Sequence, residues 1–221
     1  MWVVKLSCSL FSADCLRDWV DRLAASERPL VVVPGGGPFA DQVRDAQQRW
    51  QIDDAHAHAM ALLAMEQMGL MLCALNSGLV PCSNSMAIRS ALADGHVAVW
   101  MPSRHVLAQN RIQGDWSVTS DSLSLWLAGE LGAQGVLVVK SAPLRAAAAS
   151  AAALQSEGIV DGAFDRFARA LVCPVWLVHR QEHAALEELL SEQCPAAVRV
   201  LSTTAVQADA QDGVAASVSR T

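Results

Sequence analysis

The sequence has no tyrosine, and only two of its 16 basic side chains are lysines, the other 14 being arginines. Without tyrosine, any ring that stacks on a ligand must come from Trp, Phe or His. The basic side chains are scattered along a chain of net charge −6, which argues against nucleic acids and anionic membrane surfaces as partners. A small molecule is the partner that this composition favours.

Long apolar runs and a leader-like N-terminus are also missing. No apolar run reaches the roughly 18 residues that a bilayer span requires. The chain enters a strand-like pattern without a basic segment and apolar signal core, so we expect a cytoplasmic protein without membrane contact. The six cysteines form no C-x-x-C pair and have no matching histidine spacing, which predicts reduced thiols and no metal site.

Alternating strand-like and helix-like segments indicate the fold class. The 221 residues, 52% of them hydrophobic, can form one sizeable α/β core. We expect an α/β fold, a three-layer αβα sandwich with a mainly parallel open sheet, over residues 1–202, and a disordered tail at 203–221. The expected strands are Trp2–Leu6, Leu30–Val33, Leu70–Leu75, Val97–Met101, Val136–Lys140, Val175–Val178 and Val198–Leu201. The expected helices are one capped by Ser12, then Phe39–Arg49, Asp54–Gly69, Asn84–Ala93, Asp121–Leu131, Ala146–Leu154, Phe164–Ala170 and Glu182–Leu190.

The stretch LVVVPGGGPFAD, from Leu30 to Asp41, reads as strand, loop and helix. Its four apolar residues suit a strand buried on both faces of a parallel sheet. Because Gly35, Gly36 and Gly37 lack a Cβ, the backbone can turn its N–H groups towards an anion at the start of the next helix. The loop matches neither the P-loop nor the G-x-G-x-x-G spacing. It predicts a phosphate or carboxylate site, although three glycines can also simply make a tight turn.

The two lysines occupy equivalent places. Lys5 follows the apolar run Trp2–Val4, and Lys140 follows Val136–Val139. In open parallel sheets, ligands bind beyond the carboxyl ends of the strands, and a compact ammonium group is a usual partner of phosphate. The alternative is chance placement of two residues. Asp121 starts a predicted helix, where a carboxylate is also favoured by the helix dipole.

Together, VVKL, VVVPGGGPFAD, the Ser120-Asp121 helix start and Lys140 resemble the amino acid kinase family. The resemblance implies ATP and Mg²⁺, an acceptor-binding part at about 1–118 and a nucleotide-binding part at about 119–202. It makes Lys5, Asp121 and Lys140 the candidate catalytic residues. It implies phosphate or acceptor contacts from Gly35–Gly37 and from Ser7, Cys8 and Ser9, which stand where the family has Gly-Gly-Ser. Candidate nucleotide contacts are Lys140, Ser141 and Asp161.

Within that family, AHAMALLAMEQMG, DWSVTSDSLSLWLA and VLVVKS resemble the subgroup that phosphorylates aminomethylfuranmethyl phosphate in methanofuran synthesis, in archaea and C1-metabolising bacteria. That implies a small-molecule phosphate acceptor and a diphosphate product. Side chains at Ser7 and Cys8 could crowd the phosphates, and Ser141-Ala142-Pro143 replaces the family's Val-Asp-Gly. A kinase-fold protein that binds an anion or nucleotide without turnover is therefore the alternative.

Three further features are open to interpretation. His56 and His58 are two residues apart on a helix and point in different directions, so they are poor joint metal ligands. The resemblance to isopentenyl phosphate kinases, in which a histidine contacts the acceptor phosphate, suggests His56 for that role, and a surface or core role for at least one of the two is the alternative. Asp115 and Trp116 can line the acceptor pocket or hold a loop. The helix Asp54–Gly69 is apolar all round, which predicts burial against a second copy of the chain, at least a homodimer. The loop Asn76–Ser83 could cover that face instead.

Overall fold

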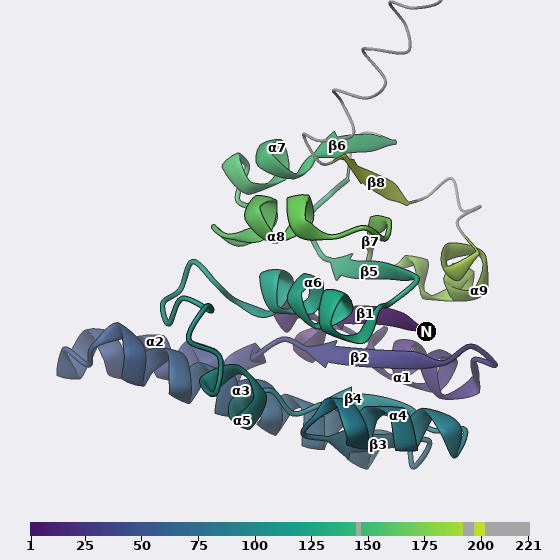
Figure 1. The fold of residues 1–221 in the computed structure, drawn as a ribbon, viewed down its shortest axis with the longest axis horizontal. Helices are drawn as coiled ribbons and strands as arrows, with labels where there is room; N and C mark the ends of the chain where they lie inside the picture. Colours follow the sequence, from purple (N-terminus) through teal and green to yellow (C-terminus); the bar gives the residue numbers. More distant parts are fainter. Residues whose placement is uncertain (145–146, 192–196, 202–221) are drawn as a thin grey trace, which may run out of the picture.

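The computed structural model describes residues 1–144, 147–191 and 197–201. In these residues eight strands form one sheet, in the order β3-β4-β2-β1-β5-β7-β8-β6 (Figure 1). Its neighbours pair in parallel except β7 with β8, so the predicted mainly parallel α/β sheet is confirmed. The strands are β1 (Trp2–Leu6), β2 (Leu30–Pro34), β3 (Leu79–Cys82), β4 (Val97–Trp100), β5 (Gly135–Lys140), β6 (Ala148–Ser150), β7 (Val175–His179) and β8 (Val198–Leu201).

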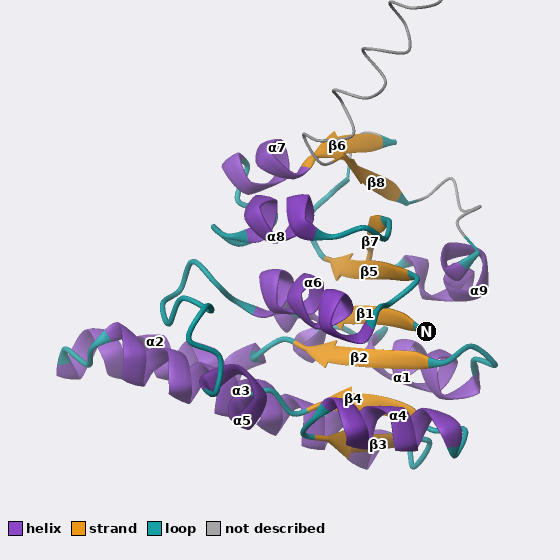
Figure 2. Ribbon diagram, viewed as in Figure 1, coloured by secondary structure: helices purple, strands orange, loops and turns teal. Residues whose placement is uncertain are grey.

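Helices cover both faces of the sheet, which gives the three layers seen in Figure 2. One face packs against α4 (Ser85–Ala93), α6 (Ser120–Leu131), α7 (Ala151–Ser156) and α8 (Phe164–Ala170). The other packs against α1 (Leu16–Ala25), α9 (Leu186–Leu190) and the end of α3 (Asp54–Leu75). Successive residues of β1 alternate between these two cores, as the period of a strand requires.

The central strand β1 positions the site. Lys5 is level with Val33 of β2 on one side and Val138 of β5 on the other. The segments that follow these strands therefore meet at one edge of the sheet: the short helix η1 (Cys8–Ser12), the glycine loop leading into α2 (Gly37–Trp50), and the loop after Lys140. Ligands of open α/β sheets bind at this edge, where connections leave a central strand in opposite directions.

Helix α3 is longer than expected. The predicted strand Leu70–Leu75 is wrong, because α3 continues through Gly69 to Leu75. Gly69 allows close packing there, since a Cβ at that position would lie 2.9 Å from Met101 Cε and displace the methionine side chain. Strand β3 begins only at Leu79, inside the expected loop Asn76–Ser83.

The length and composition of α3 are also those of a membrane-crossing helix, but 39% of its most apolar window is buried inside this fold. It contacts α2, β2, β3 and β4, which makes it a partly buried core helix.

Two other boundaries differ from the sequence prediction. In place of a helix over Ala146–Leu154, residues Ala148–Ser150 form β6 beside β8, and α7 starts at Ala151. Alanine-rich sequence favours helix, yet pairing with a neighbouring strand decides the conformation. Helix α1 starts after Cys15, and Ser12 belongs to η1. The segment Ser103–Leu107 forms the short helix α5. The expected tail 203–221 lies outside the described residues.

Candidate active site

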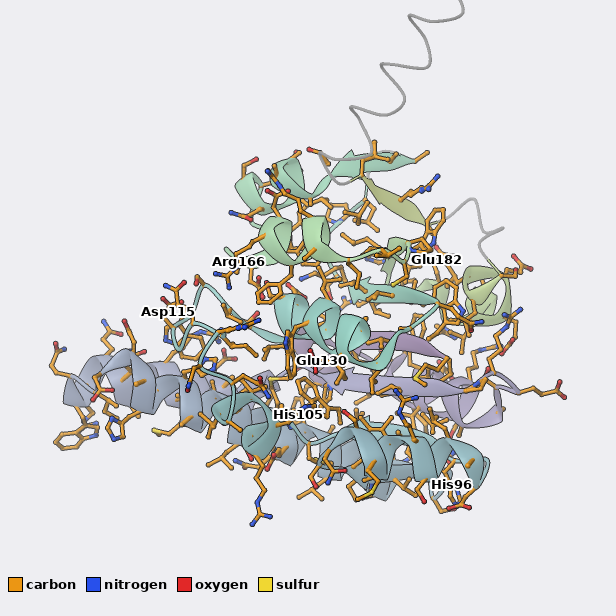
Figure 3. The ribbon with its side chains drawn as sticks, viewed as in Figure 1. His96, His105, Asp115, Glu130, Arg166 and Glu182 are labelled. Carbon is orange, nitrogen blue, oxygen red and sulfur yellow. The ribbon has the colours of Figure 1, made fainter. Side chains whose placement is uncertain are left out.

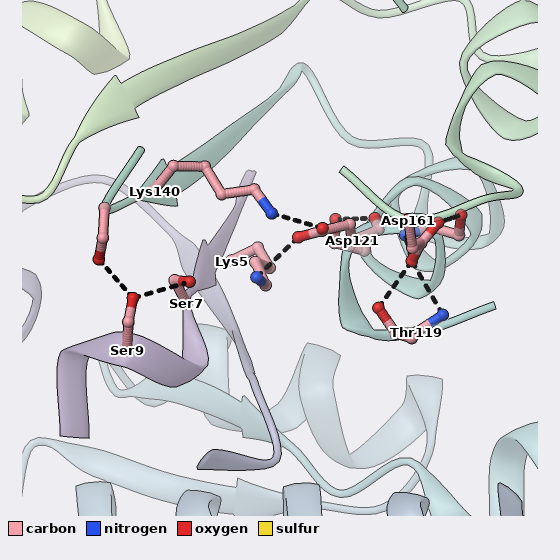
Figure 4. Close-up of polar contacts among 10 residues, drawn as sticks. Lys5, Ser7, Ser9, Thr119, Asp121, Lys140 and Asp161 are labelled. Carbon is pink, nitrogen blue, oxygen red and sulfur yellow. Dashed lines mark hydrogen bonds and ion pairs between the residues drawn. The ribbon is translucent and has the colours of Figure 1, made fainter. Parts of the chain in front are cut away.

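Two lysines share one carboxylate at the carboxyl edge of the sheet. Lys5 Nζ lies 2.6 Å from Asp121 Oδ1, and Lys140 Nζ lies 2.5 Å from Asp121 Oδ2 (Figure 4). Their exposed fractions are only 2% for Lys5, 5% for Asp121 and 8% for Lys140. The structure therefore brings together all three candidate catalytic residues, from β1, α6 and β5.

The net charge of this trio is positive, and its pKa shifts follow from burial and charge. Burial favours the neutral lysine, but the Asp121 carboxylate outweighs it and raises the Lys5 pKa. Lys140 is affected by burial and by the Lys5 charge, which together lower its pKa despite Asp121. Burial would raise the Asp121 pKa, but the Lys5 and Lys140 charges hold it below its ordinary value. A buried pair of cations with one anion between them is suited to receive further negative charge.

Asp161 holds the start of α6 in place. Its Oδ2 accepts hydrogen bonds from Thr119 N and Thr119 Oγ1, both at 2.8 Å, and from Ser122 N at 3.0 Å. Its Oδ1 accepts one from Ser122 Oγ (Figure 4). Burial and then the Asp121 charge raise the Asp161 pKa. Asp161 thus caps α6 and orients the turn that carries Asp121. Asp161, a predicted nucleotide contact, lies near the site, but its carboxylate already accepts hydrogen bonds from four donors.

The triple glycine has three different roles. The Gly35 N–H donates to Leu6 O at 2.9 Å, which takes it out of the predicted set of phosphate donors. A Cβ on Gly35 would lie 2.6 Å from Cys8 Sγ, so this glycine makes room for Cys8. Gly36 is the N-cap of α2, and Gly37 has φ +54°, in the left-handed region. Pro38 has no N–H and Ala40 N donates to Gly36 O, so the N–H groups of Gly36, Gly37 and Phe39 are the candidate anion donors at the start of α2.

Ser7, Cys8 and Ser9 lie beside the lysines. Ser9 Oγ donates to Ser7 Oγ at 3.3 Å and is hydrogen-bonded to Ser141 Oγ, so η1 and the loop after β5 are in contact (Figure 4). Ser141, a predicted nucleotide contact, therefore lies beside η1. Cys8 lines a small cavity together with Gly36 and Ser120.

Two cavities lie close in sequence to the trio, and none of the three trio residues belongs to either lining. The smaller, of about 50 Å³, lies on the α2 and α3 side. It is lined by Cys8, Gly36, Ala40, Arg44, His58, Ala61, Leu62, Met65, Trp116, Val118, Thr119, Ser120 and Leu123. The larger, of about 510 Å³, opens directly after Lys140 and Ser141. It is lined by Ala142, Pro143, Leu144, Ala149, Leu154, Glu157, Ile159 and Val198. A volume of 300–1,000 Å³ is typical of a small-molecule site.

The two histidines of α3 differ in position. His56 is exposed, and its Nδ1 lies 2.7 Å from Asp53 Oδ2, so the structure does not bring it to the site. His58 is 8% exposed and lines the small cavity. Burial lowers the His58 pKa, and the Asp115 charge only partly opposes this, so His58 is neutral near pH 7. The i, i+2 spacing showed that the two rings diverge but not which one faces inward.

Sequence reasoning also missed Arg44. This residue lies on α2 and belongs to the lining of the small cavity. Its seven-residue distance from Gly37 gave a weak signal, because that spacing returns to the same helix face.

The structure separates the roles of Asp115 and Trp116. Asp115 accepts hydrogen bonds from Ser117 N at 2.8 Å and from Gln113 Nε2 at 2.6 Å, which gives it the role of holding the loop. Trp116 lines the small cavity instead.

The fold agrees with that of known proteins. Residues 1–143 match the amino acid kinase family. The chain is 25% identical over 170 residues to the [5-(aminomethyl)furan-3-yl]methyl phosphate kinase of Methanocaldococcus jannaschii, covering 76% of this chain and 69% of that protein. Among solved structures it is similar to uridylate kinase from Archaeoglobus fulgidus, at TM-score 0.69, 12% identity and coverage of 90% and 99% of the two chains. It also resembles UMP kinase from Ureaplasma parvum, at TM-score 0.68, 13% identity and coverage of 90% and 97%. This protein therefore belongs to the amino acid kinase family.

Proposed function

We propose that the protein is a kinase that transfers the γ-phosphoryl group of ATP to the phosphate of a small phosphomonoester. The observation that carries the proposal is the buried Lys5–Asp121–Lys140 trio at the carboxyl edge of the sheet. Transfer between two phosphates gathers negative charge at one point, and positioned cations and N–H donors are most of the machinery such a reaction needs. Membership of the family supports the same reaction class.

Each group has a part in this scheme. An oxygen of the acceptor phosphate attacks the γ-phosphorus, the bond from that phosphorus to the β-bridging oxygen breaks, and ADP leaves with the released electron pair. Lys5 neutralises charge between donor and acceptor, and Lys140 binds the donor phosphates. Asp121 holds both ammonium groups in place. The N–H groups of the first turn of α2 bind the acceptor phosphate.

The residues present fit ATP with Mg²⁺. The larger cavity is mostly apolar and large enough for a nucleoside, and Ala142, Pro143 and Leu144 of its lining follow Lys140 closely in sequence. Within residues 1–144, 147–191 and 197–201, no cluster of three metal-ligating side chains is found. Mg²⁺ bound mainly through substrate phosphates and water needs no such cluster. The ion would lower the charge repulsion between the two substrates.

For the acceptor, we propose [5-(aminomethyl)furan-3-yl]methyl phosphate, with a diphosphate as product in methanofuran or methylofuran synthesis. The Methanocaldococcus jannaschii relative is named as the kinase of this compound, and its match covers 76% of this chain, which supports the choice. The small cavity supports a compact acceptor. We also propose that the protein is cytoplasmic.

Purified protein with ATP, Mg²⁺ and the furan phosphate tests the proposal. We expect ADP and the diphosphate product in equal amounts. Replacing Lys5 by Ala should lower kcat/KM by about 10²- to 10³-fold, the scale of a lost charge-stabilising donor. The matched control is Arg28→Ala, because Arg28 is a cation with an exposed ion pair to Glu187. ADP formation no greater than background would exclude this acceptor, and normal turnover by the Lys5 variant would exclude the role of Lys5.

A binding protein without turnover is the second candidate, and one observation favours it. Cys8 Sγ fills the space in front of Gly35, and Ser9 contacts Ser141 across the site. Calorimetry with ATP analogues separates the candidates, because tight binding without ADP formation supports the binding protein. Restoring glycine at residues 7 and 8 would then restore turnover if those side chains block it.

We further propose a homodimer formed through α3. Although α3 packs on the sheet, Met60, Leu63 and Leu70 on its outer face are 36%, 51% and 57% exposed. Burial of that apolar face by the same face of a second copy gives a self-complementary interface. The loop and strand at Asn76–Ser83 leave these side chains exposed, so they do not supply the alternative cover.

A further inference from the structure

One tryptophan and one arginine lie against each other in the lining of the small cavity beside the glycine loop. Asp115, labelled in Figure 3, marks the loop that runs beside α2 and carries Trp116 as its next residue. The Arg44 guanidinium carbon lies 4.3 Å from the centre of the Trp116 ring. The half-exposed Arg44 side chain defines the rim of the cavity, and Gly36 of the glycine loop belongs to the same lining.

The tryptophan is fixed, whereas the arginine can move. Trp116 Nε1 donates to Gln47 Oε1 at 2.6 Å, and Gln47 Nε2 donates to Asp54 Oδ1 at 2.8 Å, so two helices hold the ring plane. Arg44 Nη1 lies 2.7 Å from Asp41 Oδ1, but the Arg44 side chain is 49% exposed. Exposed ion pairs and exposed cation–π contacts are weak, so Arg44 can leave the Trp116 face when a ligand enters.

Most of the lining is apolar. The apolar residues are Ala40 from α2, Ala61, Leu62 and Met65 from α3, and Val118 and Leu123 from around α6, and the polar groups are those of Cys8, His58, Thr119 and Ser120. At about 50 Å³, the cavity has about a tenth of the volume of the larger one. Movement of Arg44 enlarges it at the rim, but the fixed ring and the helix walls limit that growth. A ribose with a base attached is bulkier than a single flat ring, and this mostly alkyl lining offers its hydroxyl groups few partners.

From this geometry we propose that Trp116 and Arg44 determine acceptor specificity: they admit a phosphomonoester carrying a single flat ring and exclude a nucleoside monophosphate. The ring lies against Trp116, the phosphate lies at the first turn of α2, and Arg44 closes over the ligand and adds positive charge. The inference rests on the proposed function, because it takes this cavity as the acceptor side of the kinase site.

Binding measurements test the selectivity without requiring turnover. Benzyl phosphate and UMP are titrated by calorimetry into the whole protein, the first as a one-ring probe and the second as a nucleotide. The wild type should bind benzyl phosphate more tightly than UMP. Trp116→Ala should weaken benzyl phosphate binding by about tenfold or more, the scale of a lost stacking partner, and leave UMP binding unchanged or stronger. Arg44→Ala should weaken both ligands and Arg44→Lys less so.

The chain supplies a matched control. Trp50 is the last residue of α2, is 69% exposed, and has the Arg49 guanidinium carbon 5.3 Å from its ring centre, away from the cavity lining. Trp50→Ala should therefore keep the wild-type preference. Trp116→Phe, which retains a ring face but loses the Gln47 hydrogen bond, should give an intermediate preference and covers the case in which Trp116→Ala does not fold.

The outcomes separate this inference from the kinase proposal. An unchanged ratio of the two affinities in the Trp116 variants, a wild-type preference for UMP, or a wild type that binds neither ligand would overturn the selectivity. Absence of ADP formation, with the expected preference intact, would overturn the kinase activity and leave the selectivity standing. With turnover present, the same change should appear in KM for the one-ring acceptor while kcat changes little.

Discussion

Asp121→Asn is the sharpest test of the site as an electrostatic unit. The change keeps the shape of the side chain but removes the carboxylate charge that Lys5 and Lys140 share, with ammonium groups 2.6 Å and 2.5 Å from its oxygens. All three residues are at least 92% buried. Removing one partner of a buried ion pair typically costs about 3–5 kcal/mol, because the remaining charge is left unpaired. Two cations lose their partner here, so we expect about 5 kcal/mol, a third or more of the stability of a typical domain.

The pH dependence gives this prediction a sign. Burial and the Lys5 charge already lower the Lys140 pKa below its ordinary value of 10.5, and loss of Asp121 lowers it further. The folded variant then binds fewer protons than the unfolded chain between that lowered pKa and 10.5, so its stability rises with pH across this window. The deficit relative to the wild type should therefore be largest near pH 7 and smaller at pH 10.

Urea unfolding followed by tryptophan fluorescence at the two pH values measures both effects. The control is Glu187→Gln, because Glu187 is a 60% exposed carboxylate in an ion pair with Arg28, and such pairs are worth about 0–1 kcal/mol. A deficit for Asp121→Asn as small as that of the control would refute the buried trio. A deficit that grows between pH 7 and pH 10 would refute the assignment of the unpaired charge to lysine.

Three other predictions concern different parts of the molecule. Gly37→Ala should destabilise the protein by about 1–2 kcal/mol in the same urea assay, because Gly37 has φ +54° and its new Cβ would lie 2.7 Å from Met68 Sδ; an unchanged midpoint would contradict this. Burial raises the Cys73 pKa to about 11, so iodoacetamide at pH 8 should alkylate Cys73 about 100-fold more slowly than a thiol of pKa 9.0. Peptide mass spectrometry measures the two rates, and equal rates would show an exposed thiol. Leu63→Glu together with Leu70→Glu should convert a dimer into a 23.5 kDa monomer in light scattering, and a wild-type mass of one chain would exclude the dimer.

The central sheet could be predicted because its sequence signals are local. The apolar runs before Lys5, Pro34 and Lys140 are long enough for buried strands, and each ends at a residue that changes the pattern. Parallel strands with helical connections then place the ends of neighbouring strands at one edge. That reasoning is sufficient to bring Lys5 and Lys140 towards the same side of the sheet, where the structure has them.

The features that escaped prediction depend on contacts distant in sequence. Gly69 looked like the end of a helix, but its lack of a Cβ serves the packing of α3 on Met101. The cap that Asp161 supplies to α6 joins residues about 40 positions apart, and no spacing rule indicates it. Likewise, Arg44 enters the site only because the loop carrying Trp116 folds against α2.

The position of β1 between β2 and β5 has a consequence for synthesis of the chain. Its partner on one side, β2, is complete once residue 34 has been synthesised, whereas β5 ends at residue 140. At about 5–20 residues per second, the second edge of β1 stays open for about 5–20 seconds. An open edge of apolar sequence invites pairing with another chain, and a lysine within such a strand discourages it. Until Asp121 and β5 arrive, the Lys5 charge can therefore protect the nascent chain against aggregation.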